Sequence, residues 1–447
     1  GRCALRRRQG TRPTAGVSIR CRPDALTGRQ NVDNRQMHRV SPVGDSAGFT
    51  FCAYVRRSSA PMSQVRERFV SSEGPPAGPM RRLVFSNYDS VGNPYYGGGG
   101  ARAIHEIARR LTGLYNVRVV TGQFPGNRAR IVDGVAYEPI GLRRAGPYLG
   151  QMLYQFCLPW RAARGDYDLW VESLTPPFST ACLPWFTRKP VAALTQVLAG
   201  AGMTRKYGLP FATIERLGLR AYRHAIVLST HLRTVVTRAN PRLRTVVIPN
   251  GVSPDLIDLP VRRDERHLLF LGRIDIEQKG LDLWIEALAA IAPRLAPPVL
   301  IAGTGPARQE QQLRRRIASL GLEDKVRLLG KVGDQAKSEL LRQSFLMVMP
   351  SRHEASPLVL IEAFCHAVPV VMFDIPDLGD IPGDCCVKVP AFDTRAFGEA
   401  VLDLITDEAR RSALGRVAKA FARRFSWDDL APQYAAFFEE MFSDTAL

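Results

Sequence analysis

The chain has 447 residues, of which 45% are hydrophobic, and a formal net charge of +19 from 61 Lys and Arg against 42 Asp and Glu. This globular composition excludes wholesale disorder, and the length predicts two or three domains. No run of roughly 18 apolar residues is present, so the sequence predicts no membrane-spanning helix. The eight cysteines include no C-x-x-C pair. That pattern argues against structural zinc and a disulfide framework and favours a reducing cytoplasm.

The positive charge lies in the first 258 residues: the net charge is +9 over residues 1–79, +13 over 80–258 and −3 over 259–447. Residues 1–79 are rich in Arg, Ser, Pro and Gly, show no sustained periodicity and lack the apolar segment of a secretory signal. We interpret them as a disordered extension or as sequence upstream of a natural start at Met62 or Met80. An Arg-rich transit peptide is the alternative.

Residues 80–258 alternate between expected strands and helices. A buried strand at 81–88 leads through a glycine-rich loop to a helix at 103–111, whose apolar residues recur at helical spacing. Further β-rich segments are expected at 117–122, 168–173, 190–196, 224–230 and 245–251. Strands separated by helices predict parallel βαβ units and a doubly wound sheet.

A second series of the same kind follows a polar stretch near residue 259. Its expected strands lie at 267–273, 298–305, 325–330, 346–351, 369–374 and 386–390. An amphipathic helix is expected over 281–295. The chain is therefore predicted to be an α/β protein with two Rossmann-like domains, 80–258 and 259–426, and a final segment 427–447.

Four glycines, Gly97–Gly100, precede the first expected helix, and residues 98–103 satisfy the dinucleotide pattern G-x-G-x-x-A. The strand at 117–121 ends in Thr-Gly-Gln and lacks the acid that holds a ribose 2′-hydroxyl in dinucleotide enzymes. A dinucleotide oxidoreductase is therefore a rival interpretation only. We expect the glycines to let the backbone approach an anionic ligand beside the helix start; a flexible loop is the alternative.

Two cations, Arg273 and Lys279, lie in the loop between the expected strand at 267–273 and the helix at 281–295. Ligands of open α/β sheets bind at this carboxyl edge. A guanidinium fork and a mobile ammonium together suit a diphosphate. Either cation alone would be interpreted as a solvated surface charge.

The segment at 350–371, PSRHEASPLVLIEAFCHAVPVV, is the most informative in the chain. Ser356 is expected to cap a helix whose first residue is Pro357. The free amides of Leu358 and Val359 then point out of the sheet edge, where they can bind an anion.

Two glutamates of this segment are candidate ligand contacts. Glu354 lies in the loop before the helix, where it can reach the hydroxyls of a ligand. Glu362 lies inside the helix among apolar residues, and an acid in such a stretch needs a partner. His353 adjoins Glu354 and either contacts substrate or stays an exposed loop residue.

These features together resemble the family 4 (group 1) retaining glycosyltransferases, which have the GT-B fold. The resemblance covers about residues 80–442. It rests on Glu354 and Glu362 with seven residues between them, the G-R-x5-K-G segment Gly272–Gly280, the stretch Ile248–Val252, and the A-G-x-G-P turn Ala302–Pro306. It implies two doubly wound, Rossmann-like domains that face a deep cleft, the N-terminal one for an acceptor and the C-terminal one for a nucleotide-sugar donor.

The resemblance also implies a role for each candidate residue. Arg273 and Lys279 would bind the donor diphosphate and stabilise the departing nucleotide, and Glu354 would bind the hydroxyls of the donor sugar; these three are the expected catalytic residues. Glu362 would bind the nucleotide ribose. The other expected donor contacts are Gly98, Gly99, Gly100, Gly272, Gly303, Ser356, Leu358 and Val359.

The same resemblance carries expectations about the reaction. Transfer would retain the anomeric configuration, with the donor phosphate accepting the proton of the acceptor. No metal and no cofactor besides a UDP- or GDP-linked co-substrate is expected, because Arg, Lys and a helix dipole replace the metal. A final helix from about Trp427 would cross back onto the first domain.

The sequence departs from the family pattern at two positions. Many members have a His that contacts the transferred sugar where this chain has Gln196, whose amide can hydrogen-bond a hydroxyl but cannot act as a base. The glutamate motif usually continues Glu-Gly-Phe, whereas here it is Glu354-Ala355-Ser356. The second change leaves the donor sugar open.

Other functions and partners are compatible with parts of the same sequence. The alternative function is a nucleotide-sugar epimerase or hydrolase on the same fold. A nucleic-acid-binding protein is the remote alternative, because no nucleic-acid-binding motif accompanies the positive charge. We therefore expect no nucleic-acid partner. The basic N-terminal half predicts a glycan or lipid-linked acceptor at an anionic membrane surface, with the protein peripheral on the inner face. Residues 142–164 either seat in that interface or form a core helix. His105 and His224 are expected to be structural or solvated.

Overall fold

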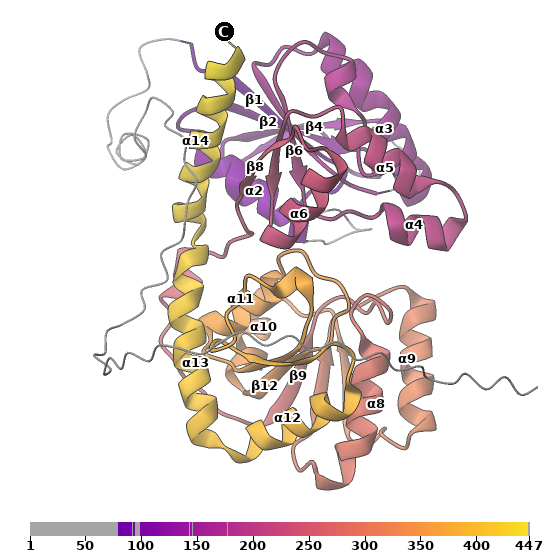
Figure 1. Cartoon of the computed structure of the whole chain (residues 1–447), viewed down its shortest axis with the longest axis vertical. Helices are drawn as coiled ribbons and strands as arrows, with labels where there is room; N and C mark the ends of the chain where they lie inside the picture. The colour runs from indigo at the N-terminus through magenta and orange to yellow at the C-terminus, as the bar shows by residue number, and fades with distance from the viewer. Residues whose placement is uncertain are drawn as a thin grey trace, which may run out of the picture. The chain divides into compact units, whose positions relative to one another are not determined.

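The computed structural model describes residues 79–91, 93, 99–142, 144, 146–176 and 178–445, which all lie within one compact unit. The expected extension, residues 1–79, therefore lies outside the described residues except for Pro79. Gly98, an expected donor contact, also lies outside them. Every strand expected from the sequence forms, and these strands make two separate sheets (Figure 1). The sheets lie in an N-terminal lobe that ends at Val247 and a C-terminal lobe that begins at His267.

The sheet of the N-terminal lobe has the order β3-β4-β2-β1-β5-β6-β7-β8. Its strands are β1 (Arg82–Asn87), β2 (Asn116–Gly122), β3 (Arg130–Val132), β4 (Val135–Ile140), β5 (Leu169–Ser173), β6 (Val191–Thr195), β7 (His224–Val227) and β8 (Arg244–Val247). All neighbouring pairs are parallel except β3 with β4. That hairpin was missing from the sequence-based prediction. Its turn is Asp133-Gly134, both with positive φ, which is a strong hairpin signal.

Helices cover both faces of this sheet, so alternate residues of β1 enter two different cores. Leu83 and Phe85 pack with α2 (Gly99–Leu111) and α14 (Trp427–Thr445), whereas Val84 packs with α3 (Pro147–Arg164). Figure 1 shows α14 on the side of α2, away from α3. The remaining helices of the lobe are η1 (Leu183–Trp185), α4 (Gly200–Tyr207), α5 (Phe211–Leu219) and α6 (Thr230–Ala239).

The sheet of the C-terminal lobe is parallel throughout, in the order β11-β10-β9-β12-β13-β14. Its strands are β9 (His267–Leu271), β10 (Val299–Ala302), β11 (Val326–Gly330), β12 (Ser344–Met349), β13 (Val370–Asp374) and β14 (Val387–Pro390). All five residues of β9 are buried, as expected for a parallel strand covered on both faces. The lobe's helices are α8 (Leu281–Ile291), η2 (Ala292–Arg294), α9 (Ala307–Ser319), α10 (Asp334–Arg342), α11 (Leu358–Cys365), η3 (Pro376–Leu378), α12 (Thr394–Thr406), α13 (Glu408–Ala422) and η4 (Arg423–Phe425).

The chain passes between the lobes twice, and the two passages are hydrogen-bonded to each other. The first passage contains α7 (Pro254–Ile257), and the second leads into α14. The amide of Val252 donates to the carbonyl of Phe425 at 2.8 Å, and the amide of Trp427 donates to the carbonyl of Val252 at 3.1 Å. Among the described helices, none is both long enough and apolar enough to cross a membrane.

Candidate active site

Glycines bring neighbouring strand ends into contact at the carboxyl edge of the C-terminal sheet. Gly272 follows β9 and Gly303 follows β10. Gly303 has φ +142, and a Cβ atom there would overlap the carbonyl oxygen of Gly272. Only glycine fits this position, so both predicted donor contacts lie in a surface made of closely packed backbone.

Lys279 and Glu354, which are 75 residues apart in the chain, meet at this edge. The Nζ atom of Lys279 lies 2.6 Å from Oε1 of Glu354, and the hydroxyl of Ser351 donates to the same oxygen at 2.6 Å. The side chains of Glu354 and Lys279 are only 6% and 16% exposed. Such a shielded ion pair orients both side chains, because each supplies polar contacts that replace water lost on burial.

Arg273 lies on the same loop but points to other partners. Its Nη2 atom donates to Oε1 of Gln278 at 2.6 Å and lies 3.6 Å from the carboxylate of Asp275. The side chain is 60% exposed. Arg273 is therefore a solvent-facing cation beside the Lys279–Glu354 pair, available to an anionic ligand without breaking a buried contact.

The helix after Glu354 begins one residue later than predicted. Pro357 is the N-cap of α11 and Leu358 its first residue, and Ser356 does not cap the helix. The hydroxyl of Ser356 accepts a hydrogen bond from the backbone amide of Asn250 at 3.0 Å, and its carbonyl accepts from the Asn250 side chain at 3.2 Å. The Ser356 hydroxyl therefore joins α11 to the first passage between the lobes, a long-range partner that local capping rules cannot anticipate.

Glu362 has the partner that its apolar surroundings required. Its carboxylate lies 2.5 Å from Nζ of Lys337, a residue of α10, and the side chain is 9% exposed. Lys337 also lies 3.1 Å from Asp334, which in turn lies 3.1 Å from Arg102 of α2 in the N-terminal lobe. Burial opposes the charge on Asp334, but the hydrogen bonds from Lys337 and Arg102 lower its pKa overall.

The N-terminal lobe contributes Gln196 and two of the four glycines, Gly99 and Gly100, which are the first residues of α2 and do not form the expected loop. Nε2 of Gln196 lies 3.4 Å from the carbonyl oxygen of Gly100, and a Cβ atom on Gly100 would come within 2.8 Å of the Gln196 amide. A Cβ atom on Gly99 would come within 3.0 Å of Leu358 in the C-terminal lobe. The start of α2 therefore approaches the start of α11. These are the two helix starts that the sequence predicts to bind an anionic ligand.

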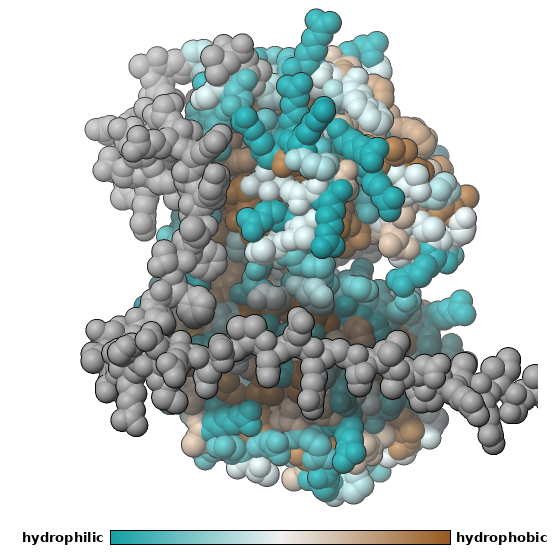
Figure 2. Space-filling view, in the orientation of Figure 1, coloured by the Kyte–Doolittle hydropathy of each residue, from teal (hydrophilic) through white to brown (hydrophobic). Residues whose placement is uncertain are grey.

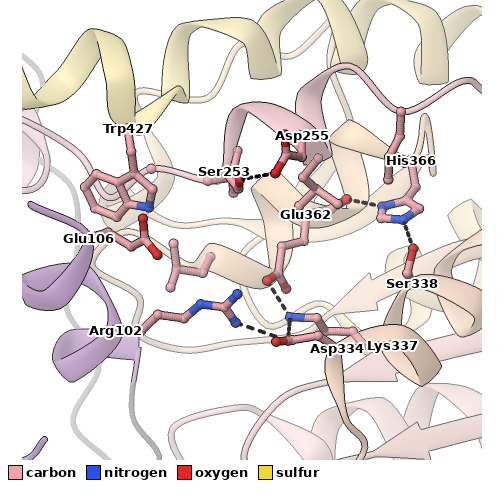
Figure 3. Close-up of a pocket in the computed structure, with 15 residues that line it drawn as sticks. Arg102, Glu106, Ser253, Asp255, Asp334, Lys337, Ser338, Glu362, His366 and Trp427 are labelled. Carbon is pink, nitrogen blue, oxygen red and sulfur yellow. Dashed lines mark hydrogen bonds and ion pairs between the residues drawn. The ribbon is translucent and has the colours of Figure 1, made fainter. Parts of the chain in front are cut away.

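A cavity of about 290 Å³ lies between α2, the first passage, α10, α11 and Trp427. Figure 3 shows Arg102 and Glu106 entering it from α2, opposite Lys337 and Glu362. Of the predicted site residues, Leu358 and Glu362 line this cavity. Arg273, Lys279, Glu354 and Gln196 do not line it, so the predicted residues extend beyond the cavity along the sheet edge.

Several cavity residues were missed by the sequence analysis: Arg102, Glu106, Ser253, Asp255, Asp334, Lys337, Ser338, His366 and Trp427. Burial opposes the charge of Glu106, yet the hydrogen bonds from Arg109 and Arg110 lower its pKa overall. His366 lies 2.6 Å from the Ser338 hydroxyl, and burial lowers its pKa. Asp334 and Lys337 are three residues apart, a spacing at which a helical ion pair can be predicted from the sequence. Nothing in the local sequence predicts that this pair lies beside Glu362.

The three histidines considered in the sequence analysis each have a side-chain partner. His105 contacts the Tyr137 hydroxyl at 2.8 Å, and His224 contacts Asp444 at 3.3 Å. His353 is 70% exposed, and its Nδ1 atom lies 3.5 Å from Oδ2 of Asp377. Within the described part of the chain, no group of three or more His, Cys, Asp or Glu side chains is arranged to hold a metal ion.

Comparison with known proteins identifies the family. Residues 97–256 match a family model described as Glycosyltransferase Family 4, and residues 265–407 match one described as Glycosyl transferases group 1. The chain is 30% identical over 205 residues to a phosphatidyl-myo-inositol mannosyltransferase of Mycobacterium leprae (strain TN), a match that covers 43% of this chain and 53% of the relative. It is 29% identical over 279 residues to an alpha-D-kanosaminyltransferase of Streptomyces kanamyceticus, covering 60% of this chain and 66% of the relative.

The matched part thus spans about half the length of the mannosyltransferase. Among solved structures, the sucrose-phosphate synthase of Thermosynechococcus elongatus superimposes with a TM-score of 0.68 at 18% identity, covering 81% of this chain and 100% of that one. This likeness concerns the fold. The two family models show that the chain belongs to the group 1, family 4 glycosyltransferases, and its two α/β lobes and its structural neighbours show that it has the GT-B fold.

Proposed function

We propose that the protein transfers a hexose from a nucleoside-diphosphate sugar to an acceptor, with retention of anomeric configuration and without a metal ion. The observation that carries the proposal is the shielded Lys279–Glu354 pair at the carboxyl edge of the C-terminal sheet. It presents a cation for a diphosphate beside a carboxylate for sugar hydroxyls. Both groups are held in place before any ligand arrives, which is the preorganisation that electrostatic catalysis requires.

The donor would lie along the sheet edge, from the diphosphate site towards the cavity. Lys279 and the exposed Arg273 would bind the phosphate oxygens, together with the amides at the start of α11. Glu354 would accept hydrogen bonds from the sugar. Glu362 would bind the ribose, in place of or together with its present contact to Lys337.

The chemical step would take place where the two helix starts approach each other. The acceptor oxygen would form a bond to the anomeric carbon as the bond from that carbon to the diphosphate oxygen breaks. The acceptor's proton would pass to that departing phosphate oxygen, while Arg273 and Lys279 stabilise its negative charge. Gln196, held against Gly100, would hydrogen-bond the sugar or the acceptor.

The test combines donor binding with transfer. We expect one of the common UDP- or GDP-linked hexoses to stabilise the wild-type protein, by about 2.7 kcal/mol at 100 times its dissociation constant. Glu354→Gln should lower the rate of transfer about 100-fold or more, because the amide cannot pair with Lys279 or accept as strongly from sugar hydroxyls. Circular dichroism and the urea midpoint check that the variant is folded.

Glu277→Gln is the matched control, because that side chain lies on the Arg273–Lys279 loop and is 81% exposed. It should transfer at the wild-type rate. Transfer by Glu354→Gln at the wild-type rate would contradict the site, and stabilisation by no member of the donor panel would contradict the donor class. Donor isomerisation or hydrolysis that is fast and independent of acceptor would favour an epimerase or hydrolase instead.

We further propose that the acceptor is lipid-linked and that the N-terminal lobe docks on an anionic membrane. Helix α3 buries Tyr154, Leu158 and Ala162, as a core helix should, but exposes Leu149, Phe156 and Trp160 by 57%, 67% and 61%. These three residues are seven and four positions apart, so they share one helix face. Figure 2 shows apolar surface on the side of this lobe where α3, α4 and α5 lie in Figure 1.

Aromatic contacts extend this face from α3 to α5, and cations border it. The rings of Phe156 and Phe178 lie 6.3 Å apart, and those of Phe178 and Phe211 lie 5.5 Å apart. Arg164 stacks over Trp160 at 4.9 Å, and Lys206 over Tyr207 at 5.1 Å. Exposed aromatic rings beside cations suit the headgroup region of an anionic bilayer.

Co-sedimentation with vesicles tests this partner. The wild-type protein should bind vesicles that contain phosphatidylglycerol and should bind pure phosphatidylcholine much less. Replacing both Phe156 and Trp160 by Ser should weaken binding to the anionic vesicles at least 10-fold and leave turnover of a soluble acceptor unchanged. Equal binding to both kinds of vesicle, or by both proteins, would contradict the docking surface.

A further inference from the structure

Asp377, in the short helix η3, links Glu354 to the opposite lobe. Its Oδ2 atom accepts a hydrogen bond from the backbone amide of Glu354 at 3.0 Å. Its Oδ1 atom lies 3.3 Å from Nε2 of His231, on α6 of the N-terminal lobe. The Asp377 side chain is 17% exposed and that of His231 37%, so solvent screens this contact less than it screens an ordinary surface pair.

A second carboxylate of the same loop also reaches α6 but has no contact with Glu354. Oδ2 of Asp380 accepts from the backbone amide of Thr230 at 2.7 Å, at the start of that helix. Asp380 is exposed. The loop after β13 therefore contacts the start of α6 through Asp377 and Asp380. Of these two acids, Asp377 is the one that also accepts a hydrogen bond from the Glu354 amide.

We propose that Asp377 is a positioning residue that makes the geometry of Glu354 depend on the approach of the two lobes. This inference rests on the proposed function, in which Glu354 binds the donor sugar. With His231 in place, the carboxylate of Asp377 is held from one side and directs its other oxygen to the Glu354 amide. Nδ1 of His353, the residue before Glu354, also lies 3.5 Å from Oδ2 of Asp377, but the His353 side chain is 70% exposed. With the lobes apart, Asp377 loses the contact with His231 and keeps this exposed one, so the acceptor of the Glu354 amide is held less firmly.

The hydrogen bond from the Glu354 amide to Asp377 can affect the Glu354 carboxylate because the position of the backbone determines where the side chain begins. The Glu354 carboxylate reaches Lys279 and Ser351 from a loop that has no helical or strand hydrogen bonds at this residue. The hydrogen bond from the Glu354 amide to Asp377 therefore has a large share in defining the position of Glu354. Closure of the lobes would complete the sugar site, which links donor use to a closed, water-poor cleft.

Hydrogen exchange tests the link without relying on activity. In the full-length protein, the amide of Glu354 should exchange at least 10-fold faster in Asp377→Ala than in the wild type. His231→Ala should accelerate the same amide by a smaller factor, and Asp377→Asn, which keeps one acceptor oxygen, should restore part of the protection. Asp380→Ala is the matched control and should leave the Glu354 amide unchanged.

Kinetics then tests the consequence for transfer. Asp377→Ala should lower kcat at least 10-fold while nucleoside diphosphate binds within 2-fold of the wild type, because Arg273 and Lys279 remain. The double variant Asp377→Ala/His231→Ala should be no slower than Asp377→Ala alone, since both changes break one linkage.

Each outcome bears on one claim. Unchanged exchange of the Glu354 amide in Asp377→Ala, or equal acceleration by Asp380→Ala, would overturn the inference. Multiplicative losses of kcat in the double variant would overturn the coupling through His231. Accelerated exchange in a protein that transfers no sugar would support the link and refute the proposed function.

Discussion

Among single residues, Glu172 on β5 is a buried acid that the proposed chemistry does not use. Its carboxylate accepts from the amide of Ala181 at 2.6 Å and from the hydroxyl of Tyr222. Burial raises its pKa from 4.5 to about 7, although these hydrogen bonds act in the opposite direction. Between about pH 4.5 and pH 7, Glu172 therefore keeps its proton in the folded protein and releases it in the unfolded chain.

This difference predicts a pH dependence of stability. Because the pKa of the folded state is the higher one, the contribution of Glu172 is fully present below about pH 4.5 and is lost as the pH rises to about 7. The loss should be about 3 kcal/mol, from about 1.4 kcal/mol per pKa unit. Urea unfolding at pH 5 and pH 8 measures the larger part of this loss.

Glu172→Gln is the comparison that isolates this residue, because the amide has nearly the same shape and does not titrate. The difference in unfolding free energy between wild type and variant should shift in favour of the variant between pH 5 and pH 8. A difference that stays constant over this range would show that Glu172 is ionised in the folded protein throughout.

At the scale of secondary-structure elements, Gly280 determines how closely α8 approaches the end of β12. It is the N-cap of α8 with φ +62, and a Cβ atom there would overlap the carbonyl oxygen of Pro350. Gly280→Ala should therefore destabilise the protein by more than about 2 kcal/mol, from backbone strain and the clash together. It should also weaken donor binding, because Lys279 precedes this residue and Ser351 follows Pro350. Urea unfolding and titration with donor measure the two effects.

Gly321→Ala separates the two causes. Gly321 has a similar φ of +65, but no atom lies within 4 Å of its Cβ position. This variant should lose only about 1 kcal/mol, from the strained backbone alone, and should bind donor normally. Equal losses for both variants would mean that contact between the two loops contributes nothing.

At the scale of the whole molecule, the last helix of the chain completes the core of the first lobe. Phe438 on α14 is fully buried, and its ring lies 6.4 Å from that of Phe85 on β1 and 6.2 Å from that of Tyr115. Phe438→Ala should lower the free energy of unfolding by about 3–5 kcal/mol. The loss should appear in the N-terminal lobe, as faster hydrogen exchange in β1 and α2, although the change lies at the C-terminal end of the chain.

A control with the same chemistry is Phe186→Ala, in the same lobe, because that ring is 51% exposed. Its effect should stay within about 0.5 kcal/mol. If Phe438→Ala were as mild, α14 would be a peripheral helix and the N-terminal lobe would have a core of its own.

Local signals explain why much of the fold was predictable. Runs of apolar residues predicted the parallel strands, because a strand covered on both faces is apolar along its length. The same reasoning placed Gly272 and Lys279 at the carboxyl edge. The hairpin of β3 and β4 was missed because β3 has only three residues and is partly exposed.

The sequence by itself determined two α/β lobes, the glycines at the strand ends and the residue types of the candidate site, since these depend on neighbours along the chain. Only the tertiary structure decided their partners. The partner of Glu362 is Lys337, which lies on a different helix. The partner of the Glu354 amide is Asp377, which lies in the loop after another strand. Such contacts depend on how elements pack at distances of many residues, and neither spacing nor periodicity records that packing.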